Sequence, residues 1–294
     1  MTMTPEQALR APSAPGSTAR GPSAAFFDLD GTLIPGSANI PLAWVAFRAG
    51  MVTPRELVHD LRHGVSFLVQ GATDERSETV RDRILGAVAG RPAADVIALS
   101  EHVVEDLVAS ITPPMRAVLA EHADAGRDRV VLSASPTEIV SRLADAAGLE
   151  MGTGTSSEVD SEGRYTGRLA GPFCYREGKA QVLREVARER GYDLAGCYAY
   201  TDSISDLPML EAVGHPVVVN PEPALRELAE QRSWPIVETA RFPRVAVSDL
   251  HGWARLGQRL AVKSVGAMVA LGTRPIEALG GIDGLGEDAA GEAA

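Results

Sequence analysis

Residues 24–33 read AAFFDLDGTL, and this stretch decides how the rest of the chain is interpreted. Its apolar half, Ala24 to Phe27, predicts a buried strand of a parallel sheet. Alternation along a strand turns Asp28 and Asp30 to the same side, at the carboxyl end where open α/β sheets hold their ligands. Two like charges repel each other at close range, and a divalent cation bound by their oxygens would offset that repulsion. The stretch therefore predicts an acidic, metal-dependent site at the end of the first strand.

Gly31 and Thr32 complete this acidic segment. Glycine allows the backbone to approach a ligand closely, and threonine supplies a hydroxyl and a backbone N–H. The plain alternative is a polar exit from a strand, with the aspartates serving as turn formers. The uninterrupted apolar strand directly before Asp28 favours the ligand site over that alternative.

The composition is that of an ordinary globular protein. Of 294 residues, 45% are hydrophobic and 23% are charged, which allows one large α/β domain with an insertion, or two domains. The formal net charge of −11 argues against nucleic acid as the main partner, but a metal would still admit an anionic small molecule. The cysteines, Cys174 and Cys197, have no CxxC neighbour, so we expect no zinc and a reducing, cytoplasmic location. No apolar run of about 20 residues predicts a transmembrane segment.

Strands alternate with helices from about residue 112 to residue 240. Apolar runs predict strands at 129–132, 197–200 and 216–219, and helical patterns cover 113–125, 137–147, 178–190, 207–212 and 224–231. Two polar strand-like runs within 152–169 flank a turn at 160–163 and predict a hairpin. The alternation predicts parallel βαβ units and a doubly wound α/β sheet.

Residues 36–111 form an insertion between the first acidic segment and the second strand. The pattern is helical, notably at 93–110, and the segment is too long for a simple loop. Residues 1–23 are rich in Pro, Ser, Ala and Gly, and we expect a disordered tail there. Residues 253–271 predict a helix that packs on the core, the alternative being an amphipathic helix that contacts a membrane surface weakly or binds a partner. The last fifteen residues have the composition of a disordered tail.

Three further segments place polar residues where a strand ends or a helix begins. They are Ser133-Ala134-Ser135 after the second strand, Gly178-Lys179 at a helix start, and the loop from Thr201 to Asp206. Each has an ordinary explanation by itself, such as a helix cap or a solvated lysine. The order of these segments along the chain, together with the Asp28 segment, makes the set more informative than any one of them.

These four segments resemble the motifs of the haloacid dehalogenase (HAD) superfamily, and the resemblance covers roughly residues 24–240. The closest resemblance is to the class IB hydrolases, the phosphoserine-phosphatase-like branch. It implies a Rossmann-like HAD core formed by 24–35 and 112–240, with a helical cap domain over 36–111. Residues 1–23 would then be a tail, and residues 241–294 a C-terminal helix and tail.

The resemblance also implies Mg²⁺-dependent hydrolysis of a phosphomonoester through an aspartyl-phosphate. Asp28 would attack phosphorus, and Asp30 would protonate the leaving group and later activate water. The metal ligands would be Asp28, the backbone carbonyl of Asp30, Asp202 and Asp206, the last either directly or through an intervening group. Phosphate would be bound by Gly31, Thr32, Ser133, Ala134 and Lys179.

Three positions depart from phosphoserine phosphatases. Ser37 stands where those enzymes use a glutamate to grip the substrate amino group, Ala134-Ser135 replaces two glycines, and Ser205 replaces an asparagine. We therefore expect an intact phosphoryl-transfer site without a clear preference for phosphoserine. The expected substrate is a small phosphorylated metabolite. Two alternatives stay open, namely a phosphotransferase to an alcohol acceptor and a non-catalytic ligand-binding or scaffold protein on the same fold.

Overall fold

The computed structural model describes residues 22–39, 41–42, 45, 50, 81–82, 85–86 and 88–239. Nearly all of the predicted N-terminal tail, much of the predicted cap and the predicted helix 253–271 lie outside the described residues, as does the weak membrane contact expected of that helix. The chain divides into two compact units, Met1–Arg244 and Val245–Ala294. Everything described below belongs to the first unit.

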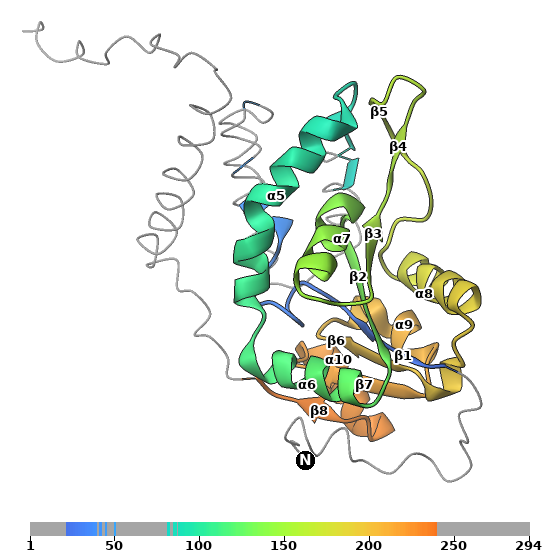
Figure 1. Cartoon of the computed structure of the whole chain (residues 1–294). Helices are drawn as coiled ribbons and strands as arrows, with labels where there is room; N and C mark the ends of the chain where they lie inside the picture. Colours follow the sequence, from blue (N-terminus) through green and yellow to red (C-terminus); the bar gives the residue numbers. More distant parts are fainter. Residues whose placement is uncertain are drawn as a thin grey trace, which may run out of the picture. The chain divides into compact units, whose positions relative to one another are not determined.

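A six-stranded sheet forms the centre of this unit, in the order β3-β2-β1-β6-β7-β8 (Figure 1). All neighbouring strands in it are parallel. The chain runs outward from β1 in one direction and then returns to add strands on the other side, so the order reverses between β1 and β6. Ligands of such sheets bind at the carboxyl ends of the strands beside this reversal. The strands are β1 Ala24–Phe27, β2 Asp128–Pro136, β3 Met151–Thr155, β6 Tyr198–Thr201, β7 His215–Val219 and β8 Ile236–Val237.

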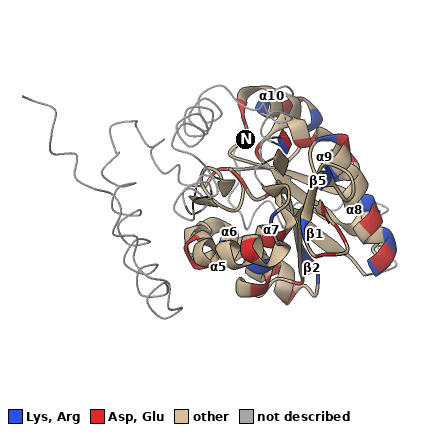
Figure 2. Ribbon diagram, turned by 90° about the horizontal axis from the view of Figure 1, so that it is seen from above, with Lys and Arg blue, Asp and Glu red and all other residues tan. Residues whose placement is uncertain are grey.

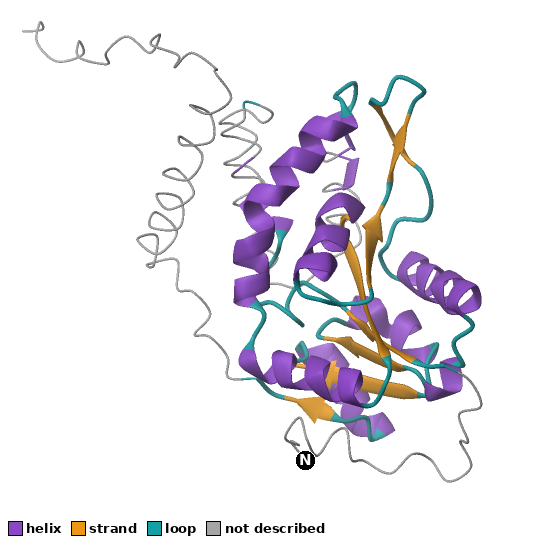
Figure 3. Cartoon of the chain, viewed as in Figure 1, coloured by secondary structure: helices purple, strands orange, loops and turns teal. Residues whose placement is uncertain are grey.

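Helices cover both faces of the sheet (Figure 3), which confirms the predicted doubly wound α/β class. Phe27 faces the cluster that includes side chains of α5, α6 and α7, whereas Phe26 faces the cluster that includes side chains of α8, α9 and α10. Because successive residues of β1 point to opposite faces, its apolar run supplies both cores. The helices are α5 Ala93–Ser110, α6 Pro113–Asp124, α7 Thr137–Ala146, α8 Glu177–Arg190, α9 Leu207–Glu211 and α10 Pro223–Arg232, with short 3₁₀ turns η1 Leu194–Gly196 and η2 Ile204–Asp206.

Residues 151–169 hold three strands where the sequence predicts two. The predicted hairpin is present as β4 Ser157–Val159 and β5 Tyr165–Leu169, but β3 before it joins the main sheet beside β2. Glycine makes this possible, because a Cβ at Gly152 would lie 2.2 Å from the Val140 carbonyl oxygen of α7. A strand that has glycines so that it can pack closely against a neighbouring backbone lacks the apolar run by which a strand is predicted from a sequence. The two-residue strand β8 was also not predicted.

The β4–β5 hairpin pairs with the segment that precedes α5. Gly90 donates a backbone hydrogen bond to the Tyr165 carbonyl at 2.7 Å, and Tyr165 donates one to the Arg91 carbonyl at 2.9 Å. The predicted insertion is thereby tied to a hairpin of the predicted core. The helix α5 continues this link, since its Val103 and Leu107 lie in the same apolar cluster as Phe27.

The outer helices carry both signs of charge. Figure 2 shows acidic and basic residues next to each other along the ribbon of α8 and α10, and Arg184 pairs with Glu177 on α8 at 2.7 Å. On these two helices the charges are mixed and do not form the one-signed basic face by which proteins hold nucleic acid. Among the described helices, none combines the length and the apolar character that crossing a membrane requires.

Candidate active site

Lys179 joins two carboxylates at the carboxyl end of the sheet. Its Nζ donates to Oδ1 of Asp28 and to Oδ2 of Asp206, both at 2.7 Å, and its side chain is 3% exposed. Burial by itself would lower the pKa of Lys179, but the attraction of Asp206 and Asp28 is greater and raises that pKa above its ordinary value. The side chain is therefore a permanently charged ammonium group.

The start of α8 explains how Lys179 reaches this position. Gly178 lies against the preceding loop so closely that a Cβ there would be 2.0 Å from the Phe173 carbonyl oxygen. Arg176 just before the helix has a positive φ of 51°, which turns the chain sharply into α8. The two residues of the Gly-Lys pair noted in the sequence thus act together. Glycine lets the first turn of α8 lie close to the preceding loop, and lysine extends into the site.

Asp28 follows the last residue of β1 and is held on both sides. Its backbone N–H donates to the Tyr200 carbonyl of β6 at 2.9 Å, and its Oδ2 lies 3.5 Å from the Thr32 hydroxyl. Burial raises the pKa of Asp28 to about 7, because the nearby Lys179 does not fully compensate for lost hydration and Asp206 adds repulsion. A further positive charge at the site would return this carboxyl group to its ionised form.

Asp202 lies against the acidic segment from the neighbouring strand β6. A Cβ at Gly31 would be 2.2 Å from Oδ2 of Asp202, and the Thr32 hydroxyl lies 3.4 Å from its Oδ1. Burial raises the pKa of Asp202 well above the ordinary range, and repulsion from Asp28 and Asp206 adds to the effect. Gly31, with a φ of 80°, is needed here because only glycine leaves space for this carboxylate.

The donor set fits a divalent cation. Asp28, Asp202 and Asp206 carry three carboxylates against the single ammonium of Lys179, and Oδ1 of Asp206 is buried without a hydrogen-bond partner. No three acidic, histidine or cysteine side chains in the described ranges converge as a preformed metal cage. Mg²⁺ does not need one, since it keeps several waters and takes one or two carboxylates together with substrate oxygens. Asp28 and Asp202 would be the carboxylates to hold it.

Asp30 is held by three donors that lie apart from this charged group. The Ala38 N–H donates to Oδ1 at 2.7 Å, and the hydroxyls of Ser37 and Ser135 donate to Oδ2 at 3.2 and 3.5 Å. Burial raises the pKa of Asp30, although these hydrogen bonds and the charge of Lys179 act in the opposite direction. A carboxyl group with a raised pKa keeps its proton to a higher pH than a free aspartate does, which suits a group that gives a proton to a base developing beside it.

The predicted phosphate-binding residues are not equally placed for that role. Thr32 lies between Asp28 and Asp202, but the Gly31 N–H already donates to the carbonyls of Ile34 and Gly36 within its own loop. On β2, the Ser133 hydroxyl accepts a hydrogen bond from the Ser135 N–H at 3.1 Å, and the Ala134 carbonyl accepts one from Thr155 at 2.9 Å. The structure thus connects Ser133 to Asp30 through Ser135.

Two residues of the site have roles that were not predicted. Thr201 donates to Oδ2 of Asp206 at 2.8 Å and so helps to orient the carboxylate that holds Lys179. Its position at the end of an apolar strand, directly before Asp202, was a usable signal. Ser37 was considered only as a substrate-contacting position, and no local pattern indicates that its hydroxyl turns back to Asp30.

Known proteins are similar to this chain in sequence. A family model described as haloacid dehalogenase-like hydrolase matches residues 25–211. A protein of Mycobacterium tuberculosis named a probable phosphatase is 40% identical over 240 residues, which cover 81% of this chain and 83% of that protein. A phosphoserine phosphatase of the same species is 34% identical over 257 residues, covering 86% of this chain and 80% of its own length.

Solved structures share the fold. A protein of unknown function from Bordetella pertussis Tohama I has a TM-score of 0.62 at 29% identity, over 74% of this chain and 98% of that one. A substrate-bound phosphoserine phosphatase has a TM-score of 0.51 at 19% identity, over 75% of this chain and 94% of that one. At that identity the second likeness concerns the fold alone.

Proposed function

The chain belongs to the family of haloacid dehalogenase-like hydrolases, on its phosphoserine-phosphatase-like branch, and from this premise we propose that it is a Mg²⁺-dependent phosphatase of small phosphomonoesters that works through an aspartyl-phosphate. One observation carries the proposal. Asp28 is buried at the end of β1 with one carboxylate oxygen 2.7 Å from the Lys179 ammonium group, while its other oxygen faces Thr32. This is the environment that a carboxylate nucleophile needs beside a dianionic ester.

Phosphoryl transfer needs charge compensation and alignment more than it needs covalent chemistry. The oxygens of a phosphomonoester repel an incoming carboxylate, and Lys179 offsets part of that repulsion because it is charged and excluded from water. An oxygen of Asp28 attacks phosphorus, and the bond from phosphorus to the alcohol oxygen breaks. Protonated Asp30 gives its proton to the departing oxygen, so the alcohol leaves as a neutral molecule.

Hydrolysis of the aspartyl-phosphate completes the cycle. Asp30 is now ionised and takes a proton from a water molecule, whose oxygen attacks phosphorus. The bond between phosphorus and the Asp28 oxygen breaks, which releases inorganic phosphate and restores both carboxyl groups. The three hydrogen bonds that hold Asp30 suit both steps, since they fix its position without making it a side-chain metal ligand.

Mg²⁺ would be held by Asp28 and Asp202, with the backbone carbonyl of Asp30 and the carboxylate of Asp206 as the further candidates. When bound, it neutralises phosphate oxygens and lowers the cost of keeping Asp28 ionised. Asp206 already serves Lys179 and Thr201 through Oδ2, so the atom it has left for a metal-bound water or for the metal is Oδ1.

The test is hydrolysis of p-nitrophenyl phosphate by the purified chain. We expect turnover with Mg²⁺, none with EDTA, and loss of turnover in Asp28→Asn, while Asp145→Asn on the exposed side of α7 keeps wild-type activity. Turnover that survives in Asp28→Asn would reject the aspartyl-phosphate. Glycerol added as a second acceptor would give glycerol phosphate if the enzyme were instead a phosphotransferase.

Phosphoserine itself is not part of this proposal, although one relative is named a phosphoserine phosphatase. At the position where that class uses a glutamate for the substrate amino group, this chain has Ser37, and its hydroxyl donates to Asp30. The residues that accept the alcohol part of the substrate must therefore be sought elsewhere in the structure.

A further inference from the structure

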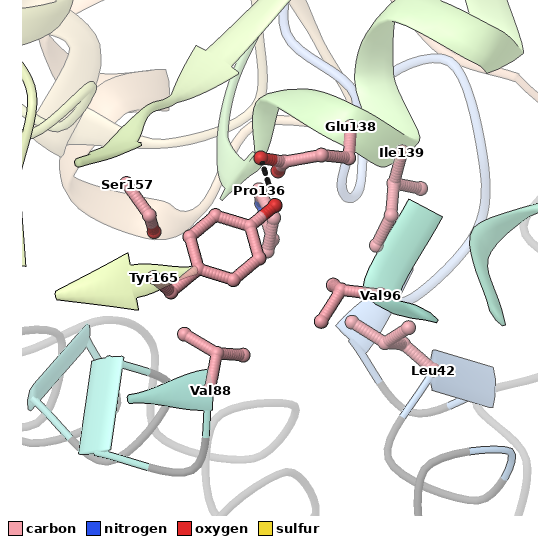
Figure 4. A pocket seen from close by; sticks show the side chains of 8 residues that line it. All are labelled: Leu42, Val88, Val96, Pro136, Glu138, Ile139, Ser157 and Tyr165. Carbon is pink, nitrogen blue, oxygen red and sulfur yellow. Dashed lines mark hydrogen bonds between the residues drawn. The ribbon is translucent and has the colours of Figure 1, made fainter. Parts of the chain in front are cut away.

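A small cavity lies where the predicted insertion meets the start of α7 and the β4–β5 hairpin (Figure 4). Apolar side chains from all three parts form most of its wall. They are Leu42, Val88 and Val96 from the insertion, Pro136 and Ile139 from the end of β2 and the start of α7, and Tyr165 from β5. Two polar residues, Glu138 and Ser157, complete the lining.

Two walls of this cavity begin beside the carboxyl group of Asp30. Pro136 directly follows Ser135, whose hydroxyl lies 3.5 Å from Oδ2 of Asp30. Leu42 donates its backbone N–H to the carbonyl of Ala38 at 3.4 Å, and Ala38 donates its own N–H to Oδ1 of Asp30 at 2.7 Å. Two of the lining residues are therefore connected through short stretches of chain to residues that hold Asp30, the group that protonates the leaving alcohol in the proposed mechanism.

We propose that this cavity receives the alcohol part of the substrate and selects a short, uncharged aliphatic group. The inference rests on the proposed phosphatase function and adds the substrate class to it. Transfer of an aliphatic group from water to a cavity lined by Leu, Val and Ile side chains has a favourable free energy. A carboxylate or ammonium group would lose its hydration there without a partner of opposite charge that is free to bind it.

The charges around the cavity support this selection. Among the described residues that line the cavity none is Lys or Arg, and the charged one, Glu138, would repel an anionic substituent. Glu138 accepts a hydrogen bond from the Tyr165 hydroxyl at 2.6 Å, so one of its oxygens already has a partner, which weakens it as an ammonium site. Arg142, one turn further along α7, lies 3.6 Å from Glu101 of α5, so the charge of this nearby arginine already has an acidic partner.

The size of the cavity limits the length of the group. The centre of a water-sized sphere can occupy about 40 Å³ of it, which corresponds to roughly three water molecules. A chain of three or four carbons matches that space. Each methylene that enters should raise kcat/KM roughly fourfold, the usual gain for burying one CH₂ group, until the cavity is full.

Primary n-alkyl phosphates from methyl to hexyl provide the test, because their leaving groups are chemically alike and differ in length alone. We expect kcat/KM with Mg²⁺ to rise to the propyl or butyl ester and then to stop rising. Propyl phosphate should also exceed its analogues with a terminal carboxylate or a terminal ammonium group. A flat series, or a preference for either charged analogue, would overturn the inference, while hydrolysis of p-nitrophenyl phosphate in the same samples would leave the phosphatase proposal standing.

Matched variants locate the effect in this cavity. Val96→Thr keeps the shape of the side chain but adds a hydroxyl to the wall, and should lower kcat/KM for butyl phosphate several-fold without changing that for methyl phosphate. Val159→Thr is the control, since Val159 is 43% exposed on β4 and does not line the cavity. Glu138→Gln should improve hydrolysis of the carboxylate analogue. Equal effects of Val96→Thr on both esters would show that the alcohol part binds elsewhere.

Discussion

The Ser37 hydroxyl donates a hydrogen bond of 3.2 Å to Oδ2 of Asp30, seven residues earlier in the chain. The next residue, Ala38, donates its backbone N–H to the other oxygen of the same carboxyl group. Both donors lie where the chain leaves the core and enters the predicted cap. The placement of the proposed acid–base therefore depends on this connection, and any movement of the cap that shifts it would also move Asp30.

Ser37→Ala should lower kcat about fivefold with little change in KM, because it removes one hydrogen bond worth about 1 kcal/mol from the proposed acid–base. That hydrogen bond lowers the pKa of Asp30, so its loss should raise this pKa further and shift the pH profile of kcat upward. Steady-state kinetics across pH would measure both effects. Ser110→Ala is a matched control, since Ser110 is also half-buried and donates to the Leu107 carbonyl, far from the site in sequence. An unchanged kcat and pH profile would contradict the role of Ser37.

Gly31→Ala should abolish turnover by displacing Asp202, because the new Cβ would lie 2.2 Å from Oδ2 of that carboxylate. Gly36→Ala provides the comparison. Both glycines have positive φ, 80° and 88°, so both variants bear backbone strain, but nothing lies within 4 Å of a Cβ at Gly36. We expect each to lose about 1–2 kcal/mol of unfolding free energy, and Gly31→Ala alone to lose Mg²⁺ affinity, as measured by calorimetric titration. Equal Mg²⁺ affinity in the two variants would remove Asp202 from the proposed metal site.

Lys179→Met should inactivate the enzyme and destabilise it by about 3–5 kcal/mol, the usual cost of leaving buried charges without their partner. Asp28 and Asp206 would lose the positive charge that both of them contact in a site that excludes water. Adding Asp206→Asn removes one of these carboxyl groups and should restore part of the stability without restoring activity. Chemical denaturation of the four proteins in this cycle gives the coupling, and Arg184→Met on the exposed side of α8 should cost well below 1 kcal/mol. Full stability of Lys179→Met would show that the ion pairs do not hold the site together.

His122 should make the protein less stable in mild acid. Its Nε2 lies 2.8 Å from the Tyr200 hydroxyl, Arg127 donates to its Nδ1 at 2.7 Å, and it is fully buried. Burial, with repulsion from Arg127 and Arg129, lowers its pKa from 6.5 to about 3. Below pH 6.5 the unfolded chain therefore binds a proton at His122, whereas the folded protein does not. The contribution of His122 to the free energy of unfolding is complete above pH 6.5 and is lost progressively as the pH falls toward 3.

Between pH 7 and pH 5 this group should remove about 2 kcal/mol of unfolding free energy. The His122→Gln variant has no group that titrates at this position. The change in its unfolding free energy between pH 7 and pH 5 should therefore be smaller by that amount, whatever its unfolding free energy at pH 7. The comparison uses urea denaturation at both pH values. His102→Gln, on the exposed side of α5, should keep the wild-type dependence. If His122→Gln kept it as well, the proton would be taken up by other groups.

Much of the fold was predictable because its signals are local. The apolar run before Asp28 identifies β1 as a buried central strand, and the helix expected at 93–110 has those bounds as α5. Alternating patterns along residues 112–240 predicted the parallel doubly wound sheet. The order of the Asp28, Ser133, Lys179 and Asp202 segments also indicated the family, since each segment lies at a strand end or a helix start. Strands β3 and β8 were not predicted, because a glycine-rich strand or a strand of two residues has no apolar periodicity.

Residue types and their order, then, follow from the sequence alone, whereas their partnerships come from the tertiary structure. Lys179 and Asp28 are 151 positions apart, so their ion pair exists only because α8 packs on the sheet, in the same apolar cluster as Phe26 of β1. The same packing removes water and thereby raises the pKa values of Asp28 and Asp30. An apolar cavity forms because Leu42, Pro136 and Tyr165, which are distant in sequence, meet there. Local patterns carry no record of such contacts, since hydrogen-bond distance and burial depend on how the whole chain is packed.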